Sequence, residues 1–127
     1  MDTESVAATC RAKPGVTEGF PFGPDALVFK IGGKVFAIVH DASVSLKCEP
    51  GYAEVLRQQY PAVTAGYHLD KRHWNTVRLD GTVPDDILDE WIDDSFELVV
   101  STLTRAQRTT LGAPRPPAAG APDTCRT

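Results

Sequence analysis

Apolar residues alternate with other residues in two runs of the chain, ALVFKI and KVFAIV, which flank Gly32-Gly33. Alternation is typical of a β-strand with one buried face, and two glycines between such runs predict a tight hairpin. In the first run the alternation places Leu27, Phe29 and Ile31 on one face of the strand and Val28 and Lys30 on the other. In the second run it places Val35, Ala37 and Val39 on one face and Phe36 and Ile38 on the other.

Helical spacing appears in three other segments. Thr3 caps the first, Pro50 suits the first turn of the second, and Thr82 with Asp85 resembles the capping box of the third. Together with the hairpin, the spacing predicts helices at 3–13 and 50–59, a third helix that Thr82 caps and that runs to about Leu103, and further strands at 44–47, 67–69 and 74–79.

This order of elements, α-β-β-β-α-β-β-α, predicts an α+β two-layer sandwich. Its five-stranded antiparallel sheet has the helices on one face. Residues 1–105 form one domain, and residues 106–127 are rich in Pro, Ala, Gly, Thr and Arg. Such a composition buries too little apolar surface to fold, so a disordered Pro/Ala-rich tail is predicted for 106–127.

Composition and charge restrict the class of protein. The 127 residues are 42% hydrophobic and carry a net charge of −4. Eight acids and no base lie between Asp80 and Glu97, whereas residues 26–79 hold seven bases and four acids, a balance of +3. No apolar run is long enough for a membrane span and no signal-peptide pattern opens the chain, so a soluble cytoplasmic protein is predicted. Three scattered cysteines indicate neither a disulfide framework nor a zinc site.

Several phrases in order along the chain are similar to one bacterial family. They are GFPFG at 19–23, VFKIGGKVFA at 28–37, LKCEP at 46–50, YPAV at 60–63 and GYHLDKRHWNTVRLDGTVPDD at 66–86. Between Pro14 and Leu103 the chain resembles the MmcQ/YjbR-like family of small bacterial proteins. The resemblance implies the same two-layer fold and DNA binding through a double wing of β-hairpins.

Basic side chains cluster at both predicted hairpins and provide candidate phosphate contacts. Trp74 would stack on an unpaired base if it were exposed, although an inward, core position is the commoner one for a large aromatic residue on a short strand. The candidate DNA-binding residues are Lys30, Lys34, Lys71, Arg72 and Arg78 for phosphates, with His73 and Asn75 nearer the bases.

Other functions have weaker support in the sequence. His68 and His73 become cross-strand neighbours if 68–73 is a two-residue hairpin, but two ligands do not complete a metal site, so no metal or cofactor is predicted. No catalytic motif is present and the protein is expected not to be an enzyme. The alternative to DNA binding is a protein-interaction module, a homodimer or a partner complex, formed through Val28, Phe36 and Ile38 on the sheet face without helices.

Overall fold

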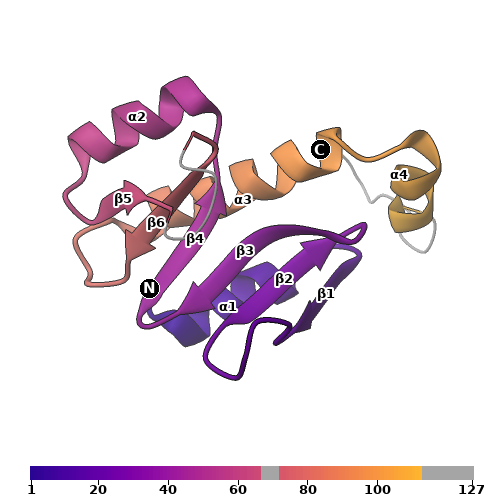
Figure 1. Cartoon of the computed structure of the whole chain (residues 1–127), viewed down its shortest axis with the longest axis horizontal. Helices are drawn as coiled ribbons and strands as arrows, with labels where there is room; N and C mark the ends of the chain where they lie inside the picture. Colours follow the sequence, from indigo (N-terminus) through magenta and orange to yellow (C-terminus); the bar gives the residue numbers. More distant parts are fainter. Residues whose placement is uncertain (67–71, 113–127) are drawn as a thin grey trace.

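One antiparallel sheet of six strands forms the first layer of the structure, in the order β1-β2-β3-β4-β6-β5 (Figure 1). The structure is a computed structural model that describes residues 1–66 and 72–112, the side chains of 109–112 excepted. The strands are β1 (Val16–Gly19), β2 (Leu27–Ile31), β3 (Lys34–His40), β4 (Ser43–Lys47), β5 (Val63–Ala65) and β6 (Trp74–Arg78), and the helices are α1 (Thr3–Arg11), α2 (Pro50–Gln59), α3 (Asp85–Ser101) and α4 (Arg105–Gly112).

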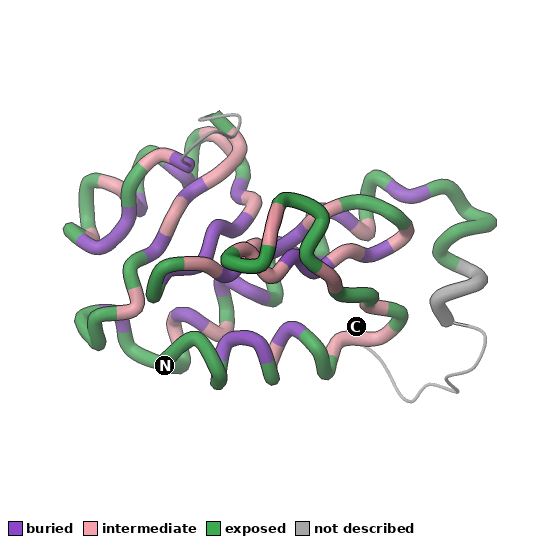
Figure 2. Tube along the Cα trace, turned by 60° about the horizontal axis from the view of Figure 1, so that its bottom comes forward, coloured by how far each residue is buried: buried purple, intermediate pink, exposed green. Residues whose placement is uncertain are grey.

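Three helices, α1, α2 and α3, cover one face of this sheet, and no helix of the described residues covers the other face. α1 and α3 lie on the central strands, and α2 lies on β5 and β6 at one edge (Figure 1). Buried and exposed positions alternate along these helices, as an inner and an outer face require (Figure 2). The predicted α+β class is therefore confirmed. Of the helices within residues 1–66 and 72–112, none is long and apolar enough to span a membrane.

The predicted hairpin joins β2 to β3 through Gly32 and Gly33. Their φ angles of 60° and 80° lie in the left-handed region, where a side chain would be strained. Gly32 also lies against Leu103, because a Cβ added at Gly32 would stand 2.6 Å from a methyl carbon of that leucine. This glycine therefore allows both the turn and its packing against the chain that follows α3.

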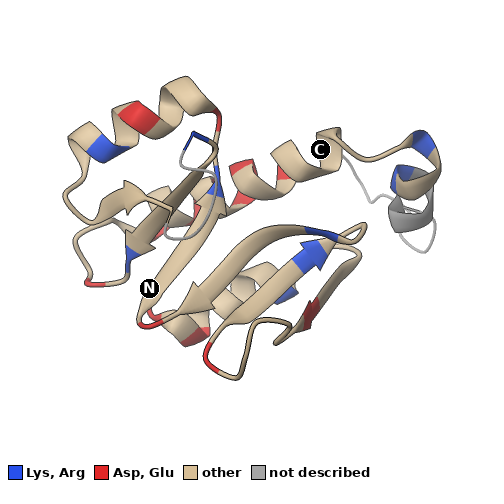
Figure 3. Cartoon of the chain, viewed as in Figure 1, with Lys and Arg blue, Asp and Glu red and all other residues tan. Residues whose placement is uncertain are grey.

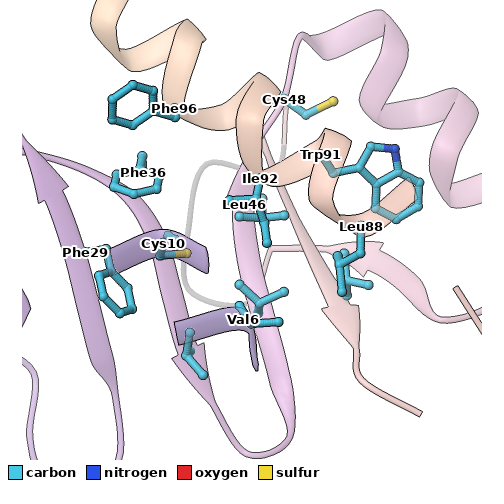
Figure 4. Packing of buried hydrophobic residues seen from close by; sticks show 14 of the residues in the cluster. Val6, Cys10, Phe29, Phe36, Leu46, Cys48, Leu88, Trp91, Ile92 and Phe96 are labelled. Atoms are coloured by element: carbon cyan, nitrogen blue, oxygen red, sulfur yellow. The ribbon is translucent and has the colours of Figure 1, made fainter. Parts of the chain in front are cut away.

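A β-bulge interrupts the pairing of β2 with β3. Phe29 lies opposite Ala37 and Lys30 opposite Val35, so Phe36 has no partner residue. As a result Phe36 turns toward the helices, where it is fully buried and its ring lies edge-on to Phe96, with 5.3 Å between centroids (Figure 4). The prediction that Phe36 shares the face of Ile38 is wrong, because strict alternation does not hold across a bulge.

The sheet has one strand more than the sequence predicts. The predicted order of elements does not include β1, which pairs with β2 along the edge of the sheet. The predicted strand 67–69 lies outside the described residues, and β6 pairs instead with β5. Two helix caps also differ from their predictions: Asp2 rather than Thr3 accepts the Ser5 N–H bond of α1, and Thr82 bonds to Asp80 while α3 begins at Asp85.

Ordered structure continues past the predicted domain boundary at residue 105. Thr104 and Gln107 form a reciprocal capping box, in which the Gln107 N–H donates to Thr104 Oγ1 and the Thr104 N–H donates to Gln107 Oε1. This box begins α4, so the predicted disordered tail does not start at residue 106. The described side chains of α4 are exposed (Figure 2). Residues 113–127 lie outside the described part of the chain.

Candidate nucleic-acid interface

The face of the sheet opposite the helices, called the open face below, carries cations and no acids among the described strand positions. Cross-strand partners share a face, so the register assigns each strand residue to one side. The acids of α3 lie on the other layer (Figure 3). The open face consists of Thr17, Gly19, Val28, Lys30, Val35, Ile38, His40, Ser43, Ser45, Lys47, Thr64, Trp74, Thr76 and Arg78.

Three cations are distributed over the open face from β2 to β6. Lys47 is paired in register with Trp74, and both side chains are half-buried. Lys30 is half-buried on β2, and Arg78 is exposed at the far end of β6. Among the residues that the structure describes, no carboxylate forms an ion pair with any of these three cations. The charges are therefore available to an external anion.

Hydroxyl groups lie between these cations. Ser45 and Thr76 are cross-strand partners at the centre of the open face, and their oxygens are 2.9 Å apart. Thr64 on β5 continues the same row. Ser45 is 8% exposed, whereas Thr76 is half-buried and Thr64 exposed, so the two threonine hydroxyls are the neutral donors that this surface offers to phosphate oxygens.

Two predicted DNA-binding residues, Lys30 and Arg78, lie on the open face, but Lys34 does not. The Lys34 ammonium donates to the carbonyl and hydroxyl oxygens of Thr102, at 3.3 and 3.1 Å, and so ties the hairpin turn to the end of α3. Arg72 is exposed and His73 half-buried just before β6. The remaining predicted residue, Lys71, lies outside the described residues, as does His68, so a pairing of His68 with His73 is not described.

Asn75 has a structural position rather than the predicted place near the bases. Its side chain is 3% exposed on the helix-covered face. The amide oxygen accepts a hydrogen bond from Arg57 at 2.8 Å, and the amide nitrogen donates to the Ala53 carbonyl at 3.2 Å. Both partners belong to α2, so Asn75 fastens this helix to β6. The assignment of Asn75 to DNA contact is therefore wrong: the pleat turns it away from Trp74 and Thr76.

Sequence reasoning missed Lys47, which the register places beside Trp74. Its position depends on Ser95, a fully buried serine of α3. The Lys47 N–H donates to Ser95 Oγ at 2.9 Å, and the Ser95 hydroxyl donates to the Phe36 carbonyl at 2.6 Å. Ser95 thus satisfies one polar group on each strand beyond the last β3–β4 pair, Ala37 with Leu46. Once β4 is paired with β6, the register alone places Lys47, since Trp74 is its direct partner.

A groove between α2 and α3 also carries titratable side chains. It is lined by Cys48, Tyr52, Asp94 and Glu97, among others, and has a volume of about 480 Å³. Burial, and secondarily the charges of Glu90 and Glu97, raise the pKa of Asp94. Burial, followed by the charge of Asp94, raises the pKa of Cys48 to about 11. Cys48 is therefore a neutral thiol at physiological pH, which does not suit a nucleophile.

The apolar patch predicted for protein contacts is largely absent from the open face. Phe36 is in the core, and Val28 is 1% exposed, with Phe20 and Pro21 of the loop after β1 beside it. Ile38 alone of the three is half-buried. The open face is therefore polar and basic rather than apolar, the property that favours an anionic ligand over a protein partner.

Fold and surface together define a class of small two-layer α+β proteins with a bare, basic sheet face. A family model described as YjbR matches residues 11–98, and the chain belongs to this YjbR family. The relatives include the Escherichia coli K12 protein named uncharacterized protein YjbR, 38% identical over 112 residues that cover 85% of this chain and 95% of the relative. Another is uncharacterized protein YbdF of Escherichia coli O157:H7, 34% identical over 113 residues, with 83% and 93% covered.

Solved structures have the same fold. A Deinococcus radiodurans protein, whose domain is described as DUF419, has 38% identity and a TM-score of 0.81, with 93% of each chain covered. A Pseudomonas syringae protein has 26% identity and a TM-score of 0.70, covering 77% of this chain and 98% of that one. The predicted family is therefore confirmed.

Proposed function

We propose that this protein binds DNA through the open face of its sheet. The observation that carries the proposal is the placement of Lys30, Lys47 and Arg78, which carry no ion pair within the described residues, on a face whose described strand positions include no acid. Cations on one surface displace the counterions of the phosphate backbone, and this release supplies most of the affinity for DNA. The proposal involves no catalytic step, and it agrees with the cytoplasmic location that the sequence predicts.

A net charge of −4 would by itself repel DNA, but the acids and the bases of this protein lie on different layers. Seven of its acids lie on α3, in the helical layer behind the sheet (Figure 3). Two of these, Asp85 and Asp93, are paired with the N-terminal ammonium and Lys13. A DNA chain that approaches the open face therefore meets cations first, and most of the acids lie beyond the sheet, where salt screens them.

The proposal differs from the sequence prediction in the part of the molecule that contacts DNA. The prediction used the tips of two hairpin wings, but Lys34 at the first tip is bound to Thr102. Lys30 and Arg78 remain, now joined by Lys47 and Trp74 on the surface between the wings. A sheet face of this kind, with cations around an aromatic ring, is the arrangement that sheet-based nucleic-acid binders use.

The test is a fluorescence-anisotropy titration with duplex and single-stranded DNA at low and moderate salt. The triple variant Lys30→Ala/Lys47→Ala/Arg78→Ala should bind about tenfold or more weakly at low salt. On duplex DNA its log–log salt slope should also be smaller by about 2 to 3. A matched control, Lys34→Ala/Arg105→Ala/Arg108→Ala, removes the same charge away from the open face and should have a smaller effect.

Two results would contradict the proposal. One is an absence of salt-dependent binding by the parent protein at low salt. The other is an equal loss of affinity in both triple variants, because that would make net charge, and not the open face, the determinant. Circular dichroism and urea unfolding of both variants exclude loss of the fold as the reason for a change.

A further inference from the structure

We propose that Phe20 and Phe22 form a stacking site for unpaired bases, so that the preferred ligand of the open face is single-stranded DNA. This inference rests on the proposed function and adds the form of the nucleic acid. It starts from the loop between β1 and β2, which carries both rings (Figure 1). Phe20 is 56% exposed and Phe22 68% exposed, so water reaches both rings.

The loop is organised to keep these rings in solvent. The Gly23 N–H donates to the Phe20 carbonyl at 3.2 Å, and the Ala26 N–H donates to the Gly23 carbonyl at 3.3 Å, which makes two successive turns. Pro21 and Pro24 restrict the backbone further. Rings that a short constrained loop holds in place lose little conformational freedom when a ligand stacks on them.

A hollow of about 430 Å³ lies beside Phe20 on the open face. Val28 gives it an apolar lining and Lys30 a cation. Gly19 leaves it open, since a Cβ added there would have no atom within 4 Å. Thr17, the cross-strand partner of Lys30, also lines it. The hollow therefore combines an aromatic surface, an apolar wall and a positive charge.

The acid that also lines this hollow, Glu18, does not oppose an anion there. Its carboxylate accepts two hydrogen bonds from the Arg11 guanidinium of α1, at 2.5 and 2.9 Å. These bonds, with the charge of Arg11, lower the pKa of Glu18. The register supports the same conclusion, because Glu18 is the partner of core residue Phe29 and so points to the helix side.

A nucleotide matches these features group by group. The flat, weakly polar base suits the face of a phenylalanine ring, and its phosphate suits Lys30. In a duplex the base faces are covered by their neighbours, so the rings of Phe20 and Phe22 can stack only on bases that are already unpaired. The cations of the open face bind either form of DNA, whereas the two phenylalanines distinguish one form from the other.

The experiment compares an oligothymidine with a duplex of the same length at one low salt concentration. The parent protein should bind the single strand more tightly. Phe20→Ala/Phe22→Ala should weaken that binding about fivefold or more for each base stacked, and should leave duplex binding unchanged. Both rings are exposed, so the variant should unfold at the same urea concentration as the parent.

A matched control removes exposed apolar surface elsewhere. Tyr52 is 43% exposed and Val55 42% exposed on α2, which packs on β5 and β6 at the opposite edge of the sheet from β1. Tyr52→Ala/Val55→Ala should bind both forms of DNA as the parent does. Equal single-strand affinity in the Phe20/Phe22 variant and the parent would overturn the stacking site.

The two proposals can fail separately. If the open-face triple variant loses affinity but the Phe20/Phe22 variant does not, DNA binding by the cations stands and the stacking site is wrong. If the Phe20/Phe22 variant loses affinity for duplex and single strand alike, the preference for unpaired bases is wrong. If the parent binds neither form at low salt, both proposals are overturned.

Discussion

The two faces of the sheet are built from the same strands but differ in almost every property that decides stability and binding. The helix-covered face is apolar and packs against α1, α2 and α3, and hydrogen bonds of Asn75 on this face and of Ser95 on α3 join the two layers. The open face has hydroxyls, cations, the half-buried Val35, Ile38 and Trp74, and the buried Val28. Stability therefore depends mainly on one face, which leaves the other free to vary with function.

The difference also shows how a single residue can change faces. Alternation alone puts Phe36 with Ile38, but the bulge turns Phe36 toward Phe29 and Phe96. The Phe36 carbonyl lies beyond the last β3–β4 pair, Ala37 with Leu46, and Ser95 supplies its donor. The bulge thus sets the direction of the Phe36 ring, and the buried serine satisfies the carbonyl of the same residue.

The largest expected effect separates Phe36 from Ile38. Phe36→Ala removes a fully buried ring, so we expect it to lower the free energy of unfolding by about 3–5 kcal/mol. Ile38→Ala is the matched control on the open face, where water already reaches the side chain, and it should cost clearly less. Urea unfolding of both variants measures this, and equal losses would contradict the assignment of the two residues to different faces.

A second effect follows from the thiols on the helix side. Burial raises the pKa of Cys10 to about 12, although Lys13 and Arg11 oppose the shift, and raises that of Cys48 to about 11. The folded thiols stay neutral while those of the unfolded chain ionise near pH 9, so stability should fall as the pH rises above about 9. Each thiol contributes about 1.4 kcal/mol per pH unit until its folded pKa is reached.

Urea unfolding at pH 8 and pH 10 tests this dependence. Because other groups also titrate in that range, the informative quantity is the difference between the parent and Cys10→Ala. The variant should lose about 1 kcal/mol less than the parent between the two pH values. Identical losses would mean that Cys10 ionises as readily in the folded protein as in the unfolded chain.

The third prediction concerns Ser95, which bonds to β3 and to β4 where the pairing of these two strands ends. Ser95→Ala leaves the Lys47 N–H and the Phe36 carbonyl without their partner in a buried position. We therefore expect a loss of about 1–3 kcal/mol, as for other unsatisfied buried groups. Ser95→Thr, which keeps the hydroxyl, is a control for the hydrogen bond, although its added methyl must fit the core. Equal stability of Ser95→Ala and the parent would remove the proposed role.

The sequence predicted those parts of the molecule that local chemistry determines. Gly32-Gly33 specified a turn, and helical spacing located α1, α2 and most of α3. It did not predict β1 or β5, because strands of four and three residues are determined by the neighbours with which they pair. The cap of α4 was readable as T-x-x-Q at 104–107, but the Pro/Ala-rich composition beyond it favoured a disordered tail.

The candidate site was less predictable, since it depends on register. Lys30 and Arg78 were found from charge alone, but charge also selected Lys34, which the fold uses to bind Thr102. Asn75 and Lys47 needed the pairing of β4 with β6, a contact between segments separated by a whole helix. Exposure of Phe20 and Phe22 was not predicted either, because burial is the usual state of an aromatic side chain.

The smallest expected effect compares one chemical group on the two faces. On the open face, the hydroxyls of Ser45 and Thr76 share a hydrogen bond of 2.9 Å. In the core, the hydroxyl of Ser95 bonds to two backbone groups. Thr76 is half-buried, so when Ser45→Ala removes its partner, water can take the vacant position. We expect Ser45→Ala to cost at most about 1 kcal/mol, less than Ser95→Ala.

A double-mutant cycle of Ser45→Ala with Thr76→Val isolates the bond between the two hydroxyls, and urea unfolding should give a coupling of about 0.5–1 kcal/mol. The same cycle between Ser45 and Ser95, which share no hydrogen bond, serves as a control and should give a smaller coupling.

If Ser45→Ala cost as much as Ser95→Ala, the open face would be shielded from water at its centre. Phosphates could then reach only its rim, and the cations at Lys30 and Arg78 would have to bind DNA without the hydroxyls between them.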